Sequence, residues 1–590
     1  MSRSGISPEK RLGSAKLVRS AFKLCVLLLA GWAGHSTIAV AQFRVDEATI
    51  PLVEAAFRDG RLTCHQLVES YLDSIAARDQ VGPAVNSFLE LNPDALTIAD
   101  QLDQDFRQTG PVGSLHCVPM VLKDNYDTAD QNHTTAGSLT MRGFLAPSDS
   151  FQVAKLRAAG AVFLGKVNMD EWAVGVSGYS SRGGQTHNPY RVNRGPGGSS
   201  AGTGVAVSAN FALAGVGTDT IGSIQLPAAF DGIVGIRPTS GLIGRSGIIP
   251  GSLFTDTSGP MTRTVTDAAI ILGVMVGIDP DDPATEASAG KSFTDYTQFL
   301  QRDGLRNAHI GVLRTLFGEP LSGDNDEVDA TFNQAVAEMQ KRGALITDPV
   351  SIDGSEADIT NLVTVNSYQF KPGLDDYFAT FGASAPVHSL ADIITASQQP
   401  GISNKVRPAT LQALIEAQKL GDLTDPAYLS ALATINSLRA SLLQFMQQNG
   451  FDALVFPSTT CVAPPLPGVI DPTYHCGSVA QPLAAGEIPG VMPPVLSPIS
   501  GFPAIVVPAG FSADGLPIEI SFFGEPFSEP TLIKFAFAFE QATKARRRPR
   551  FVVPTGAAAA TEANASPTSS TLSSKPYGWL LDDFERSEAK

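Results

Sequence analysis

The chain has 590 residues, of which 43% are hydrophobic, enough for one very large domain or several ordinary ones with a buried core. Its 42 basic and 58 acidic residues give a net charge of −16. Nucleic acids and anionic membranes attract clustered positive charge, so neither is an expected partner.

The first 41 residues have the composition of a secretory signal peptide. Six basic residues precede an apolar run at 24–33, and Ala39-Val40-Ala41 matches a small-x-small cleavage pattern. The apolar run is shorter than the roughly 20 residues of a membrane-spanning helix. We therefore expect cleavage near Ala41 and an exported protein, periplasmic or secreted, without stable membrane association. An uncleaved N-terminal anchor is the alternative.

Four cysteines lie beyond the leader, and an even number in an exported chain permits disulfide bonds. Cys461 and Cys476 bracket a proline-rich loop, which favours a disulfide between them. For Cys64 and Cys117 the sequence does not distinguish a second disulfide from two buried thiols.

Helical patterns alternate with short apolar runs through the first half of the chain. Helices are predicted at 47–77, 150–159 and 266–276, and strands at 118–122, 162–164 and 233–236. Thr63 is predicted to cap a helix, with Gln66 completing a capping box. Alternating strands and helices are typical of an α/β protein with a buried parallel or mixed sheet.

The second half contains more helical pattern. Helical spacing recurs at 333–342 and 411–446, followed by strand-like runs at 453–456 and 504–508. We therefore predict one domain over 42–550, whose sheet is interrupted by a mostly helical insertion at about 290–450. Residues 551–590 are of low complexity and are predicted to be disordered.

Neither metal nor nucleotide chemistry is predicted. The sequence has no HExxH, no paired CxxC and no phosphate-binding or dinucleotide-binding glycine motif. His116, His133 and His187 lie close to the segments described next, but isolated histidines are more often structural than ligands. We expect no cofactor and no metal.

The segment 195–239 is rich in glycine and alanine and carries Ser199, Ser200 and Ser223. Such a backbone turns sharply and leaves hydroxyl groups approachable. A serine nucleophile needs a base and donors for the developing oxyanion. Residues 198–202 match the G-x-S-x-G nucleophile elbow of α/β-hydrolases, with Ser200 as nucleophile, but that motif follows a strand and the preceding residues are loop-like. An esterase that uses Ser200 is the weaker alternative.

Lys123, at the end of an apolar run, offers a different base. Burial lowers the pKa of a lysine below its ordinary value of about 10.4, and the neutral amine can accept a proton. A relay from Ser223 through Ser199 to Lys123 would activate the nucleophile, with backbone N–H groups of the turn at 220–223 facing the oxyanion. In the alternative, Lys123 forms an ion pair with Asp124 at the surface, and the serines of 195–239 have no catalytic role and only occupy glycine-rich turns.

Residues 113–125 and 195–239 resemble the amidase signature family, whose hallmarks are a GGSS, a downstream GSI and an upstream P-x-x-x-K-D. Further blocks fit in the same order, at 165–173, 188–189, 259–263 and 503–510. The resemblance covers about 45–544. It implies an α/β amidase-signature fold, a central mixed, twisted β-sheet covered by helices on both faces.

The resemblance also implies a function, the hydrolysis of linear carboxamide C–N bonds through a Ser-cisSer-Lys triad and an acyl-enzyme. It assigns Lys123 as the base, Ser199 as the bridging serine and Ser223 as the nucleophile. The oxyanion-hole positions are Thr220, Ile221, Gly222 and Ser223, and the supporting positions are Ser200 and Asp219. Three residues depart from the family pattern, Cys117, Ile221 and Gln225, and none of them is one of the three catalytic side chains.

Two other functions remain open on this fold. The first is a transamidating subunit that acts on aminoacyl-tRNA, which the leader and the acidic charge disfavour. The second is a non-catalytic binding protein, which the intact triad disfavours. The substrate is a small-molecule amide of unknown type, an aryl or alkyl amide, a peptide amide or a urethane. Tyr368, Phe370, Tyr377 and Phe378 are candidates for either the substrate pocket or the core, and the oligomeric state is open.

Overall fold

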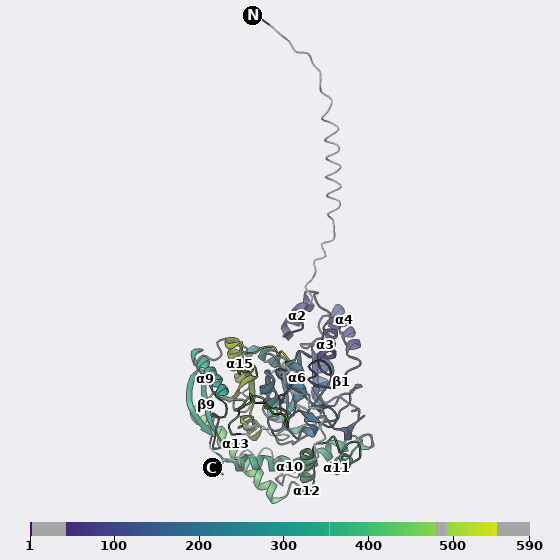
Figure 1. The fold of residues 1–590 in the computed structure, drawn as a ribbon, viewed down its shortest axis with the longest axis vertical. Coiled ribbons are helices and arrows are strands. Elements are labelled where there is room, and N and C mark those ends of the chain that lie inside the picture. Colours follow the sequence, from purple (N-terminus) through teal and green to yellow (C-terminus); the bar gives the residue numbers. More distant parts are fainter. Residues whose placement is uncertain (3–42, 353, 479–482, 484–489, 491, 552–590) are drawn as a thin grey trace. The chain divides into compact units, whose positions relative to one another are not determined.

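The computed structural model describes residues 1–2, 43–352, 354–478, 483, 490 and 492–551 (Figure 1). The chain divides into a unit of Met1–Phe43 and a unit of Arg44–Lys590, and the features below belong to the second unit. The predicted signal peptide at 1–41 and the predicted disordered tail at 551–590 lie outside the described residues, apart from their ends at 1–2 and 551.

The predicted N-terminal helix is two helices, α2 (Ile50–Arg58) and α3 (Cys64–Arg78). The predicted capping box at the start of α3 is confirmed. Thr63 Oγ1 accepts a hydrogen bond from Gln66 N at 3.2 Å, and Gln66 Oε1 accepts one from Thr63 N at 3.1 Å. Gly60, with φ at 65°, lies in the turn that separates the two helices.

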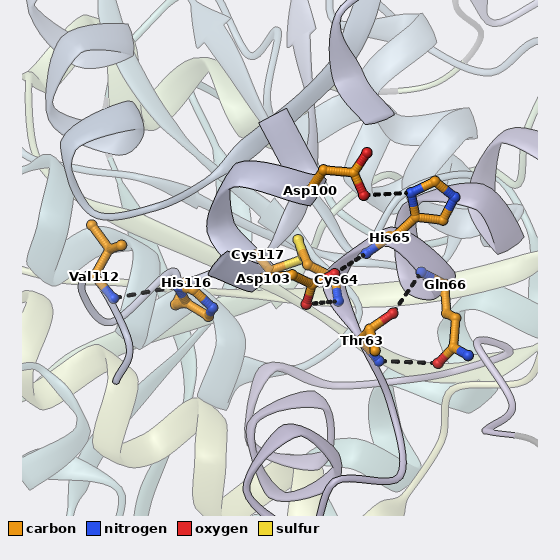
Figure 2. The surroundings of a disulfide bond; sticks show 9 residues. All are labelled: Thr63, Cys64, His65, Gln66, Asp100, Asp103, Val112, His116 and Cys117. Carbon is orange, nitrogen blue, oxygen red and sulfur yellow. Dashed lines mark hydrogen bonds and ion pairs between the residues drawn. A yellow bond between two sulfur atoms is a disulfide. The ribbon is translucent and has the colours of Figure 1, made fainter. Parts of the chain in front are cut away.

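Two disulfide bonds are present, Cys64–Cys117 and Cys461–Cys476. The second confirms the predicted pair, and the first resolves the pairing that the sequence left open. Asp103, on α4 (Ala95–Thr109), accepts hydrogen bonds from the backbone N–H groups of Cys64 and His65 at 2.7 and 3.0 Å (Figure 2). The start of α3 is thus bonded both to α4 and to the segment that leads into strand β2 (Pro119–Lys123).

A 12-stranded sheet runs through the described part of the second unit. Its strands follow the order β1 (Phe88–Leu91), β3 (Val162–Val167), β2, β6 (Ala214–Asp219), β8 (Thr257–Thr262), β7 (Val234–Arg237), β13 (Ala504–Phe511), β14 (Pro517–Phe523), β12 (Ala453–Pro457), β9 (His309–Leu316) and β10 (Glu319–Pro320), with β11 (Leu345–Ile352) pairing to β9. β2 is parallel to β3 and β6, and β9 is parallel to β11 and β12, whereas the other pairs are antiparallel. A separate two-stranded sheet joins β4 (Tyr179–Ser180) to β5 (Gly184–Gln185). The predicted mixed α/β sheet is confirmed.

Helices cover this sheet, as predicted. Those that contact its strands include α6 (Ala201–Ser208), α7 (Gln225–Asp231), α8 (Val265–Met275) and α15 (Glu529–Thr543). Helix α5 (Phe151–Ala158) packs on α8, and α14 (Leu496–Ser500) packs on α13 (Pro426–Asn449). Every residue of β2 and β6 is buried, which explains why the sequence of β2 reads as an unbroken apolar run before Lys123.

The region at 290–450 differs from a purely helical insertion. Its helices are α9 (Asp326–Lys341), α10 (Glu356–Ala379), α11 (Leu390–Ser397), α12 (Pro408–Lys419) and α13 (Pro426–Asn449). It also contributes β9, β10 and β11, which were not predicted. Since β9 pairs with β12, this region extends the sheet at the edge opposite to β1 (Figure 1).

In Figure 1, helices α10 to α13 lie together along one side of the sheet. Helix α10 packs against α11, α12 and α13. Among the helices in the described residues, none has the length and apolar composition needed to cross a membrane.

Candidate active site

Lys123 is the last residue of β2, and its side chain is fully buried. Its Nζ lies 2.8 Å from Ser199 Oγ, 2.8 Å from Thr218 Oγ1 and 3.2 Å from the Thr218 carbonyl oxygen. Thr218 belongs to the neighbouring parallel strand β6. The pairing of these two strands places Lys123 beside Thr218, and the same amine contacts Ser199, the bridging serine expected from the sequence.

Burial lowers the pKa of Lys123 from its ordinary value to about 7. The negative charges of Asp219, Asp170 and Asp256 act in the opposite direction and favour the protonated amine. The loss of hydration is the larger effect, so the neutral form of Lys123 is far more accessible near neutral pH than that of an exposed lysine. A neutral amine at this position can accept a proton from Ser199.

Ser199 follows a cis peptide bond with Gly198. The Ser199 carbonyl oxygen accepts a hydrogen bond from Asp170 N at 3.1 Å, and Ser199 has no exposed surface. Gly198 packs directly on the Asp170 carboxylate, with which any Cβ at this position would collide. Glycine at this position therefore lets the Asp170 segment approach the bridging serine closely.

Ser200 lies at the N-cap position of α6, and residues 195–200 form no strand. Its Oγ donates a hydrogen bond to the Thr218 carbonyl oxygen at 3.1 Å. The strand that a nucleophile elbow requires is thus missing in front of residues 198–202. Ser200 instead joins the GGSS segment to β6.

The turn at 220–223 connects β6 to α7. The Asp219 carboxylate accepts hydrogen bonds from the backbone N–H groups of Gly222 and Ile224, at 2.7 and 2.8 Å. It also forms a fully buried ion pair with Arg237, at 2.9 Å. Asp219 therefore stabilises the turn through buried hydrogen bonds. Arg237, the last residue of β7, neutralises its charge.

The four amides expected to form the oxyanion hole are not equivalent. Gly222 N–H is donated to Asp219, whereas the N–H groups of Thr220, Ile221 and Ser223 have no hydrogen-bond acceptor among the described residues. Gly222 has a φ of 96°, a conformation that favours glycine. Three backbone donors thus remain for a ligand oxygen at this turn.

Ser223 is 4% exposed and lines a cavity with an empty volume of about 390 Å³, counting the part open to solvent. The other lining residues are Trp172, Ala173, Val174, Gly175, Val176, Thr220, Ile221, Gly251 and Phe370. The Ser223 carbonyl oxygen accepts a hydrogen bond from Ser200 N at 3.2 Å, which joins this turn to the GGSS segment. The nucleophile predicted from the sequence therefore faces a cavity with mostly apolar walls.

Of the four aromatic residues considered for the pocket, Phe370 lines this cavity. Tyr368, Tyr377 and Phe378 are buried in hydrophobic clusters of the core. Tyr377 also donates a hydrogen bond to Asp127 at 2.7 Å.

Known proteins share both the sequence pattern and the fold of this chain. The family model Amidase matches residues 66–533. This chain belongs to the Amidase family. It is 34% identical over 523 residues to a probable amidase of Arabidopsis thaliana, a match that covers 86% of this chain and 93% of the relative. It is an enzyme, an amidase that hydrolyses carboxamide C–N bonds.

Two further members of the family are informative. The structure of a native peptide amidase from Stenotrophomonas maltophilia is 38% identical, with a TM-score of 0.76, and the match covers 86% of this amidase and 99% of that chain. A glutamyl-tRNA(Gln) amidotransferase subunit from Myxococcus xanthus is 34% identical over 472 residues, or 79% of this amidase and 92% of the relative.

Two of the three departures from the family pattern, Ile221 and Gln225, lie at this site, whereas Cys117 lies before β2, at the opposite end of that strand from Lys123. Cys117 forms the disulfide with Cys64, and Ile221 lines the cavity of Ser223. Gln225 Nε2 donates hydrogen bonds to Asp219 at 3.4 Å and to the Pro494 carbonyl oxygen at 3.2 Å. This amidase thus has a neutral, hydrogen-bonded amide next to the turn where an arginine is common in the family.

The three histidines noted in the sequence form no hydrogen bond with Lys123, Ser199 or Ser223 among the described residues. His116 Nδ1 contacts Val112 N, and His133 Nδ1 contacts the Glu90 carboxylate. His187 Nδ1 contacts the Val192 carbonyl oxygen. In the part of the amidase that the structure describes, no group of three or more His, Cys, Asp or Glu side chains is placed to hold a metal ion.

Three residues of the site were missed from the sequence, Asn125, Thr218 and Arg237. Each has a local signal in retrospect. Asn125 follows the lysine motif, Thr218 precedes the turn, and Arg237 directly follows the predicted strand at 233–236. Their roles depend on which strands are neighbours in the sheet, and sequence order does not reveal that.

Proposed function

We propose that this amidase is exported and hydrolyses linear carboxamides through an acyl-enzyme on Ser223, with Lys123 as the base and Ser199 as the bridge. The observation that carries the proposal is the 2.8 Å contact between the buried Lys123 Nζ and Ser199 Oγ. The same segment is hydrogen-bonded through Ser200 to the backbone of Ser223. These contacts hold the base, the relay serine and the cavity-facing serine in one site, and proton transfer from Ser223 Oγ to Ser199 Oγ is part of the proposal.

The hydrogen-bond partners of Lys123 suit a neutral amine. A neutral amine has two N–H groups and one lone pair, and the two oxygens of Thr218 can accept both protons. The lone pair is then left for the hydroxyl proton of Ser199. Together with the lowered pKa of Lys123, this arrangement supports its role as a general base.

In the first half of the reaction, Ser223 Oγ attacks the carbonyl carbon while its proton passes to Ser199 and the Ser199 proton passes to Lys123. The backbone N–H groups of Thr220, Ile221 and Ser223 stabilise the oxyanion. The relay then returns a proton to the nitrogen, the C–N bond breaks, and ammonia or an amine leaves. Water attacks the acyl-enzyme by the same relay and releases the carboxylic acid.

Export and substrate class are parts of the same proposal. Two disulfides support export, because disulfides persist in oxidising compartments, and the leader-like composition of 1–41 agrees with it. Similarity to a peptide amidase and the apolar cavity beside Ser223 support peptides with a C-terminal carboxamide as substrates. Similarity to the amidotransferase of Myxococcus xanthus keeps transamidation as the rival function.

A fluorophosphonate probe tests the proposed nucleophile directly. We expect covalent labelling of the purified enzyme at Ser223, located by peptide mass mapping, and loss of that label in Ser223→Ala but not in Ser200→Ala. We also expect a C-terminal peptide amide to release ammonia without any acceptor or partner protein. Labelling at Ser200, or ammonia release that requires an acceptor, would contradict the proposal.

The pH dependence of kcat/KM should report the titration of Lys123. Because the neutral amine is the active form and its pKa is lowered to about 7, activity should be constant above that pH and decrease below it. At pH 5 we expect about 1% of the plateau value, from two pH units of protonation. A profile that stays flat down to pH 5 would exclude Lys123 as the base.

A further inference from the structure

A second cavity adjoins the one that contains Ser223. The two share Ala173, Thr220 and Gly251 as lining residues. The second has an empty volume of about 340 Å³, counting the part open to solvent, and Asn125 and Asp256 are among the polar residues on its wall. The site therefore has one arm at Ser223 and a second arm, here called the polar arm, whose lining residues include more with polar side chains.

Most hydrogen-bonding groups on the polar arm already have partners. Thr218 Oγ1 is bonded to Lys123 Nζ and Asn125 Nδ2, and the Asp256 carboxylate accepts hydrogen bonds from Thr220 Oγ1 and two backbone amides. The guanidinium group of Arg245 is paired with Asp282 and donates to backbone carbonyls.

Asn125 Oδ1 is the exception on this wall. It is buried, and among the described residues it has no hydrogen-bond partner. The contact at the other end of the amide favours this orientation, because Nδ2 lies 3.4 Å from the Ile249 carbonyl oxygen, which can only accept. A buried acceptor without a donor is unfavourable, and a bound ligand that carries a donor would relieve it.

Asn125 is linked to Lys123, the proposed base, through one shared oxygen. Its Nδ2 donates to Thr218 Oγ1 at 3.1 Å, and the same oxygen is 2.8 Å from Lys123 Nζ. The turn after β6 offers backbone N–H groups without acceptors among the described residues, while Asn125 offers an oxygen without a donor. Together these groups are complementary to the two ends of a –CO–NH₂ group.

We propose that Asn125 Oδ1 accepts a hydrogen bond from the N–H of the scissile carboxamide and selects substrates whose leaving group carries such a donor, primary carboxamides above all. This proposal rests on the proposed function, since it takes Ser223 as the nucleophile. Asn125 is a specificity residue here, and the proton relay itself does not include it. An ester of the same acid presents no N–H to this position.

The test compares a primary carboxamide with the methyl ester of the same acyl group, on wild type and Asn125→Ala. We expect kcat/KM for the amide to fall about tenfold, as for a lost hydrogen bond, and that for the ester to change less than about twofold. Both rates come from one preparation, so their ratio is independent of the fraction of folded enzyme. Equal losses on both substrates would overturn the proposal.

A second variant and a control complete the experiment. Asn125→Asp retains an acceptor oxygen, so its amide-to-ester ratio should stay within about threefold of wild type. A ratio as low as that of Asn125→Ala would contradict the role of Oδ1. Ser223→Ala should abolish both reactions. If it does not, the proposed nucleophile is wrong, an outcome distinct from failure of the Asn125 proposal alone.

Discussion

Replacing Ser223 with alanine is expected to lower kcat/KM for a primary carboxamide by about 10⁴-fold or more, because the proposed acyl-enzyme forms on the Ser223 hydroxyl. The side chain is small and faces a cavity, so the melting temperature should remain close to that of wild type. Steady-state release of ammonia measures the activity, and thermal unfolding checks the fold.

Ser200→Ala is the matched control. Ser200 is adjacent to the bridging serine and fully buried, but its hydroxyl donates to a backbone carbonyl of β6. Its loss should cost about tenfold or less in kcat/KM, the usual size for one buried hydrogen bond. If Ser200→Ala were as inactive as Ser223→Ala, Ser200 would have a catalytic role that its position at the start of α6 does not suggest.

Replacing Lys123 with methionine is expected to lower kcat/KM by about 10³-fold, in the range of a lost general base. Methionine fills a similar volume without a titratable group, so the loss of activity on acidification below about pH 7 should disappear as well. The measurement is a pH–rate profile of the variant on an activated amide. If the variant kept the wild-type inflection of the pH–rate profile near pH 7, a group other than Lys123 would control the pH dependence of activity.

Lys166→Met is the control for burying a lysine. Lys166 is also fully buried, one strand away on β3, and its Nζ donates to the carbonyl oxygens of Tyr126 and His133 and to Thr134 Oγ1. Burial lowers its pKa too, so it is a second candidate for a titration seen in activity. Since it does not contact Ser199, its replacement should lower stability but leave the pH–rate inflection in place.

Local features of the sequence were enough for much of the fold. The capping box at Thr63, strand β2 and the disulfide between Cys461 and Cys476 each depend on residues that are close in the chain. Their signals are side-chain hydrogen bonds to the nearby backbone, unbroken apolar runs and a short loop between cysteines. The triad was assigned by resemblance, and the structure brings Lys123 to Ser199 as that assignment requires.

Strands β9 and β11 show where local patterns fail. Both lie in a stretch whose polar and helical character dominates the sequence, and β11 is largely exposed. A strand with little burial lacks the apolar alternation from which strands are predicted. Its place in the sheet is decided by parallel pairing with β9.

The order of residues along this chain was sufficient to single out Lys123 and the serines of 195–239 as candidates, and the resemblance to the amidase signature family assigned their roles. Two features came from the tertiary structure alone. They are the ion pair of Asp219 with Arg237 and, among the described residues, the unpaired oxygen of Asn125. Each depends on which side chains meet when distant segments of the chain pack together. Only the packed sheet shows which buried donors and acceptors are already hydrogen-bonded and which are left for a substrate.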